Sequence, residues 1–430
     1  MKKTFIVAAI AAAVLATGCA KNEIFQAPSE PTAVEFGVNV PLTKAGHVGE
    51  MTTAKLKDYS FGVFAATYAG DYADESRKMD FMYNENIDWN EGSSSWVYEP
   101  VKYWPNQIQA GNTDAQPATA FAAHKVSFFA YAPYVADPSS DSSYGITGFT
   151  AKDVAGDPKV TYKIKENVSH EVDIDDVVDL LWGVYRDPNP ANKDVDGTWT
   201  NVAGTTTTLH AGLPYLDLQK PALNTKIHFY FYHALSQIKL TAQAAYDQVA
   251  AGGTAKNGVK ITISEVKVTV PGMYTQADLN LNNVTMRTPK WENPTGNSNL
   301  VFTVSGDDLN TVIKDKGDVT AATQPAGVTG SKTDVITTGK YYTLIPKAGD
   351  VDVTVKVTYY VTTDDDKLDK TYSRVENVIQ KSVSFPGGFV GNKRYNINMV
   401  LGISEVKFDA EVEDWSADGE VSVDLPKNKE

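Results

Sequence analysis

The segment Val351–Tyr360 reads VDVTVKVTYY, and its pattern decides the fold class. Four valines and Tyr359 occupy every second position, and the residues between them are mostly polar. Successive side chains of a β-strand point to opposite faces of a sheet, so this pattern predicts a strand with one buried and one wet face. Parallel sheets, which are buried on both faces, give unbroken apolar runs instead. The segment therefore predicts an antiparallel sheet.

The same period of two recurs along the chain. It is found around Val34–Val40, Ile227–Phe231 and Val406–Val412, and Ile261–Val270 is also predicted to be a strand. Helical patterns are few, and only Ala242–Ala251, followed by two glycines, predicts a short helix. The sequence as a whole therefore predicts an all-β protein.

Three long polar stretches separate the predicted strands. Residues 137–153, 187–208 and 286–298 are rich in Gly, Pro, Asn and Ser and are predicted to be loops. A length of 430 residues, about 410 after the predicted signal peptide, favours two domains, with three as the alternative. We place an N-terminal domain at 32–272 and a C-terminal domain at 273–430; a break at 252–258 is the alternative boundary.

The first residues predict export. Lys2 and Lys3 precede an apolar stretch, Phe5–Ala16, that is too short to span a bilayer. Cys19 follows Gly18 directly and is the single cysteine of the chain. This arrangement resembles the bacterial lipobox, although Leu15 stands four positions before the cysteine rather than three. It implies a signal peptide at 1–18, acylation of Cys19 and a tether at 19–31; a plain signal peptide with an incidental cysteine is the alternative.

The composition and motifs do not indicate catalysis. The net charge of −14 disfavours nucleic-acid partners. The six histidines have no metal-site spacing on a helix. Asn192–Gly197 resembles the first half of a calcium loop, but Ala203 stands where the twelfth-position glutamate belongs. We therefore predict no catalytic residue, no metal site and no cofactor, although carboxylates paired only by the fold would escape this reasoning.

Several short segments, taken in order, resemble the fimbrillin-like family of Bacteroidales lipoproteins, the strand-exchange pilins. The resemblance extends over nearly all of the chain after Cys19. The segments are Phe61–Ala65, Tyr103–Pro105, Val126–Tyr134, Asp179–Gly183, Phe231–Ile238, Tyr341–Pro346 and the final strands ending at Trp415.

The resemblance implies two transthyretin-like antiparallel β-sandwich domains in series. It also implies a shaft, tip or anchor subunit of a fimbrium, exposed on the cell outer membrane, that contributes to adhesion. Its expected partners are other pilin subunits in a homo- or heteropolymer, the outer membrane through the lipid anchor, and a ligand on a host or bacterial surface. Lys44 matches the position at which a trypsin-like protease trims shaft subunits.

Strand exchange would involve both ends of the chain. A first strand with Val34, Phe36, Val38 and Val40 on one face is expected to fill a slot that trimming empties. Near the other end, the alternation of Val421, Val423 and Leu425 makes this segment a candidate donor strand, or else the last strand of its own domain.

A surface glycan-binding lipoprotein is the alternative function. Tryptophan rings can serve as stacking platforms for sugars, although core packing is their commoner use. Glycan binding would be favoured if four of the tryptophans were exposed to solvent on one common surface. These four are Trp89, Trp96, Trp199 and Trp291.

The first testable prediction concerns the anchor. Cys19→Ser removes the thiol that the lipobox presents for acylation, so it should abolish labelling by a fatty-acid probe and release the protein from membranes. Both are measured by fractionation of labelled cells. Membrane retention of the variant would contradict the assignment of Cys19.

Overall fold

The described part of the chain is almost entirely β-structure. The computed structural model describes residues 32–39, 53–73, 77–105, 124–140, 144–223, 225–244, 259–310, 333–337, 340–363, 374–401 and 406–415. Within these ranges the helices are α1 (Thr53–Tyr59) and three short 3-10 turns. None of the described helices reaches the length and apolarity needed to cross a bilayer. The all-β prediction is confirmed.

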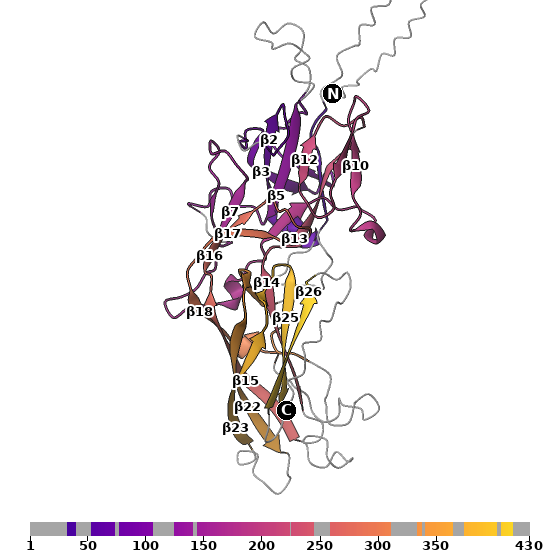
Figure 1. The fold of residues 1–430 in the computed structure, drawn as a ribbon. Coiled ribbons are helices and arrows are strands. Elements are labelled where there is room, and N and C mark those ends of the chain that lie inside the picture. Colours follow the sequence, from indigo (N-terminus) through magenta and orange to yellow (C-terminus); the bar gives the residue numbers. More distant parts are fainter. Residues whose placement is uncertain are drawn as a thin grey trace, which may run out of the picture.

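The first large sheet lies at one end of the elongated molecule (Figure 1). Strand β12 (Tyr215–Leu218) pairs with β5 beside the main path of this sheet. That path runs β1 (Phe36–Asn39), β13 (Ile227–His233), β9 (Leu181–Val184), β5 (Lys125–Ala132), β2 (Phe61–Tyr68), β3 (Met82–Asn90) and β4 (Ser95–Val97).

Two five-stranded sheets form the other end (Figure 1). One has the order β23 (Arg374–Phe385), β22 (Val351–Thr363), β15 (Val259–Met273), β18 (Ser298–Ser305) and β8 (Glu171–Val172). The other has the order β19 (Thr333–Asp334), β14 (Ser236–Ala244), β25 (Lys393–Leu401) and β26 (Val406–Asp414), with β20 (Tyr342–Leu344) also on β14.

Three smaller sheets are also found among the described residues. They are β17 (Lys290–Thr295) with β16 (Gln276–Asn280), β7 (Lys159–Lys163) and β6 (Ile146–Phe149); β10 (Gly197–Thr200) with β11 (Thr206–Leu209); and β21 (Lys347–Ala348) with β24 (Gly388–Phe389).

The segment VDVTVKVTYY lies in β22, between β15 and β23. Its four valines and Tyr359 are buried, and the residues between them are exposed or half-buried. The alternation therefore predicted both the strand and the face that it buries.

Three expectations about local structure were wrong. Residues 242–244, expected to begin a helix, are the end of β14, because the apolar face of this strand packs in the core. The predicted polar loops contain strands β6, β10, β11 and β17. Three strand pairs, β1–β13, β14–β25 and β18–β8, are parallel rather than antiparallel, since alternation of side chains does not encode strand direction.

The apolar side chains form two clusters, and β13 contributes to both. Ile227, Phe229 and Phe231 belong to the smaller cluster, whereas Tyr230 and Tyr232 on the opposite face belong to the larger one. Strands from both sides of residue 272 also share sheets, since β16 pairs with β7 and β14 pairs with β25. The division at 272–273 and the transthyretin-like arrangement stay predictions.

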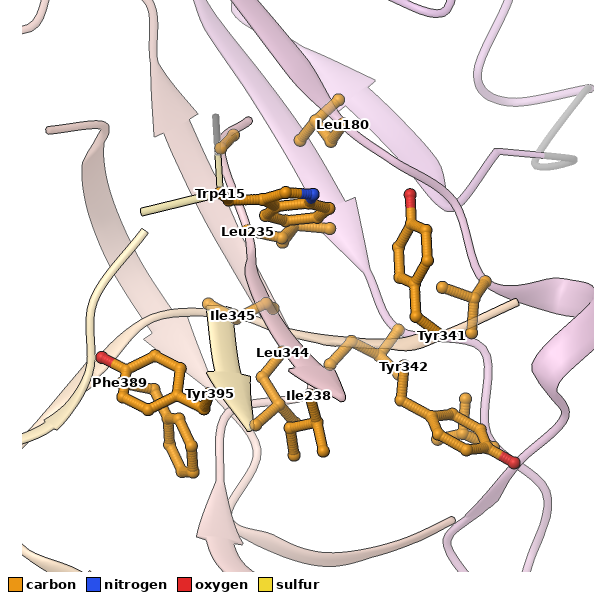
Figure 2. Packing of buried hydrophobic residues seen from close by; sticks show 14 of the residues in the cluster. Leu180, Leu235, Ile238, Tyr341, Tyr342, Leu344, Ile345, Phe389, Tyr395 and Trp415 are labelled. Carbon is orange, nitrogen blue, oxygen red and sulfur yellow. The ribbon is translucent and has the colours of Figure 1, made fainter. Parts of the chain in front are cut away.

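Trp415, the last described residue, is fully buried in the larger cluster. Its ring stacks on His233 with centroids 4.0 Å apart and planes 6° apart, and it meets Tyr341 edge-on. His233 Nδ1 lies 2.8 Å from Asp179 Oδ1, and both of these side chains are fully buried. Figure 2 shows Trp415 among Leu180, Leu235 and Tyr341. This ring therefore joins the end of β26 to His233 of β13 and to Leu180, which directly precedes β9.

The second prediction tests this junction. Trp415→Ala should lower the free energy of unfolding by about 3–5 kcal/mol, because it empties a buried site and uncovers one face of the His233 imidazole. Urea denaturation measures the change. Val378→Ala, at a half-exposed valine on β23, is the control and should have little effect. Equal effects of the two substitutions would contradict the role of Trp415.

Candidate functional site: the slot of the first strand

Strand β1, together with residues 32–35 that lead into it, closes the gap between two segments that are distant in sequence. On one side it pairs in parallel with β13, with Phe36 opposite Ile227 and Val38 opposite Phe229. On the other side, Val34 N donates to Lys102 O at 2.9 Å, and Trp104 N donates to Thr32 O at 3.0 Å. We call this space between β13 and residues 98–104 the β1 slot.

The inward face of β1 and of the residues leading into it is completely covered. Val34, Phe36 and Val38 are 1%, 2% and 6% exposed, and all three belong to the smaller apolar cluster. The Phe36 ring packs against four other aromatic rings at centroid distances of 5.5–6.4 Å. These rings belong to Phe61, Tyr98, Phe128 and Phe229. Phe36 is thus the main apolar anchor of the strand.

The outward face of β1 lies against side chains of β13. Lys226 Nζ is 3.3 Å from Glu35 Oε2 in a half-exposed ion pair. The imidazole of His228 lies over Gly37, where a Cβ atom would be only 2.6 Å from Nδ1. Burial, and next the charge of Lys226, lower the pKa of His228, which favours its neutral form. A side chain at position 37 would therefore have to displace the imidazole.

Tyr98 ties β1 to the opposite wall of the slot. Its hydroxyl donates to Val34 O at 2.9 Å and accepts from Lys102 N at 3.1 Å. Burial raises the pKa of Tyr98 to about 12. The neutral phenol is therefore the form that holds the beginning of the strand.

The structure brings together part of the predicted site. Val34, Phe36 and Val38 share the slot as described above. The remaining predicted residues lie outside the described ranges, so their roles stay predictions; they are Cys19, Lys44, Val40, Val421, Val423 and Leu425. Sequence reasoning missed Tyr98 and His228, and its only available signal was the glycine inside an otherwise alternating strand.

The calcium-like loop uses its carboxylates within the protein. Asp194 forms an ion pair with Arg287, and Asp196 accepts from Ala211 N at 2.9 Å and lies 2.8 Å from His210 Nδ1. Among the described residues, no three His, Cys, Asp or Glu side chains gather in a way that could hold a metal ion. The hydrogen bonds of this loop thus explain its acidic residues without a cation.

The four tryptophans do not form an exposed platform. Trp199 is 3% exposed, packs on Trp104 and donates its indole N–H to Gln219 O. Trp291 donates to Ala234 O, and Trp89 and Trp96 are half-buried against each other. This arrangement favours core packing over sugar stacking.

A pocket of about 430 Å³ is lined by Tyr72, Ala73, Arg77, residues 155–157 and Asn282. Its carboxylate, Asp157, already accepts from Tyr72 Oη, Asn280 Nδ2 and Asn282 Nδ2 at 2.9–3.1 Å. These hydrogen bonds hold its wall together and give Asp157 a structural role.

Comparisons with known proteins agree with the resemblance seen in the sequence. No family model matches the chain. Fimbrium subunit Fim1C of Phocaeicola vulgatus is 29% identical over 180 residues, which are 41% of this chain and 42% of that protein. The match thus spans less than half the length of this curated relative. The crystal structure of a fimbrial protein from Bacteroides vulgatus covers 90% of this chain and all of its own, with 20% identity and a TM-score of 0.59. The predicted resemblance to the fimbrillin-like family is confirmed by the first match, and the second match supports the fold.

The third prediction concerns Tyr98. Its pKa is higher in the folded state, about 12, than the ordinary 10.0, so its stabilising effect is complete below pH 10 and is lost as the pH rises towards 12. Tyr98→Phe should cost about 0.5–1.5 kcal/mol at neutral pH, because the hydrogen bond to Val34 is lost.

Urea denaturation between pH 8 and 11.5 provides the measurement. The wild type should lose more stability than Tyr98→Phe over this range, since the other buried tyrosines titrate in both proteins. Parallel pH curves would contradict the role of Tyr98.

Proposed function

We propose that this protein is a structural subunit of a cell-surface fimbrium, exported as a lipoprotein and assembled by strand exchange. The observation that carries the proposal is the β1 slot, in which a strand of four residues fills an apolar gap between distant segments. The likeness to a fimbrium subunit and to a fimbrial fold supports the same role. A structural role of this kind requires no catalytic residue.

The connectivity of β1 suits it to exchange. Neither neighbour is adjacent in sequence, because β13 begins at Ile227 and the opposite wall comprises residues 98–104. β1 therefore belongs to no hairpin and can leave without breaking one. Three buried side chains contribute about 1.5–3 kcal/mol each, so an emptied slot would strongly favour a replacement strand.

The proposal assigns a step to each end of the chain. Cleavage after Lys44 would separate β1 from α1, and the segment with Val421, Val423 and Leu425 would enter the slot of a neighbouring subunit. Such a contact is head-to-tail, so repetition produces an open filament rather than a closed ring. We further propose attachment to the outer membrane through Cys19, two transthyretin-like domains, and a contribution to adhesion.

The fourth prediction tests filament assembly in cells that produce the protein. Antibodies against it should label filaments in immunogold electron microscopy, because a fimbrial subunit is built into the appendage. Lys44→Ala should reduce the labelled filaments, since β1 would stay covalently linked.

Lys152→Ala, at an exposed position, is the matched control and should leave the filaments unchanged. Diffuse surface label without filaments would contradict the fimbrial function. Normal filaments with Lys44→Ala would contradict only the cleavage site.

A further inference from the structure

The β1 slot is shaped for particular side chains at two consecutive positions. At the first position, the Phe36 ring fills a space walled by the rings of Phe61, Tyr98, Phe128 and Phe229. Valine at this position would leave part of that space empty, and large-to-small changes in a packed core are costly because the surroundings relax only partly.

The second position excludes a side chain. Gly37 lies under the imidazole of His228, and a Cβ atom there would be 2.6 Å from Nδ1, 3.2 Å from Cε1 and 3.5 Å from Cγ. The first of these distances is too short for any real contact and the second is tight, so the imidazole would have to shift. The slot therefore accommodates an aromatic residue followed by glycine, flanked by the small apolar residues Val34 and Val38.

The candidate donor segment with Val421, Val423 and Leu425 does not have that pattern. Residues 416–430 contain no aromatic residue, and Gly419, their only glycine, lies between Asp418 and Glu420. Placing Gly419 under His228 would bury one of these carboxylates among the four rings, in either strand direction. Placing Val423 in the ring-walled space instead puts Ser422 or Asp424 under His228, again in either direction.

We propose that the β1 slot selects a strand of the pattern apolar–polar–aromatic–glycine–apolar, so that this subunit accepts a strand from an unlike subunit rather than from a second copy of itself. This inference rests on the proposed strand exchange and names the partner by its sequence chemistry. Main-chain hydrogen bonds are the same for any strand, so discrimination must come from these side-chain positions.

Peptide exchange into the full chain, nicked between β1 and α1 by limited proteolysis, tests the proposal. Displacement of a fluorescent peptide TAVEFGVNVP, the sequence of residues 32–41, reports the occupancy of the slot. The unlabelled native peptide should compete at least about tenfold better than its F36V or G37D variant, and better than GEVSVDLPKN from residues 419–428. Equal competition by the C-terminal peptide would overturn the proposal.

Two controls separate selectivity from general stability. The peptide with Glu35→Gln should compete like the native one, because the ion pair of Glu35 with Lys226 is half-exposed and such pairs contribute little. His228→Ala in the protein should remove the preference for glycine and keep the preference for phenylalanine. An unchanged glycine preference in His228→Ala would overturn the steric part of the proposal.

A final experiment separates a failure of this inference from a failure of the proposed function. If no peptide enters the nicked protein, strand exchange is wrong for this chain. In that case, the side-chain preference of the slot is tested by measuring amide hydrogen exchange of residues 34–38 in the intact chain. Phe36→Val and Gly37→Asp should each reduce protection at least about tenfold relative to Glu35→Gln, and unchanged protection would overturn the preference.

Discussion

Strand β13 is buried on both faces, and the rest of the structure depends on this constraint. Its odd-numbered residues from Ile227 to Phe231 pack in the smaller apolar cluster, and Tyr230 and Tyr232 pack in the larger one. At its end, His233 stacks on Trp415, and along its edge it pairs with β1. A single strand of seven residues thus links the first sheet, the end of β26 and the β1 slot.

In this arrangement, the contacts that hold β13 in the fold are separate from the contacts of β1, the strand that can be exchanged. β9 pairs with β13 on the edge opposite β1, and Asp179 and Trp415 flank His233. These contacts do not involve β1. Loss of β1 would expose Phe229 and Ile227 in the slot but leave the Tyr230 face and the Trp415 junction covered. The wall of the slot can therefore keep its shape while its occupant changes.

The sequence predicted the fold class and the inward face of β1 because both follow from a period of two. It did not predict strand direction, since Phe36 and Val38 are buried alike beside a parallel or an antiparallel neighbour. It also failed for residues 197–200 and 290–295, where strands are formed by mostly polar residues that pair without a regular apolar face. Tyr98 and His228 could not be predicted, because their contacts with Val34 and Gly37 join residues 64 and 191 positions apart.

Affinity and selectivity in the slot have different physical origins. Backbone pairing with β13 and burial of apolar side chains provide a general tendency to accept any alternating strand. The rings around Phe36 add a cost for small residues, and the imidazole over Gly37 adds a cost for every residue with a Cβ atom. A strand that merely alternates apolar and polar residues gains the backbone pairing and the apolar burial. It also incurs the cost at the position of Phe36 and the cost at the position of Gly37. Exclusion, rather than extra attraction, is therefore the means by which a short strand can distinguish one partner from another.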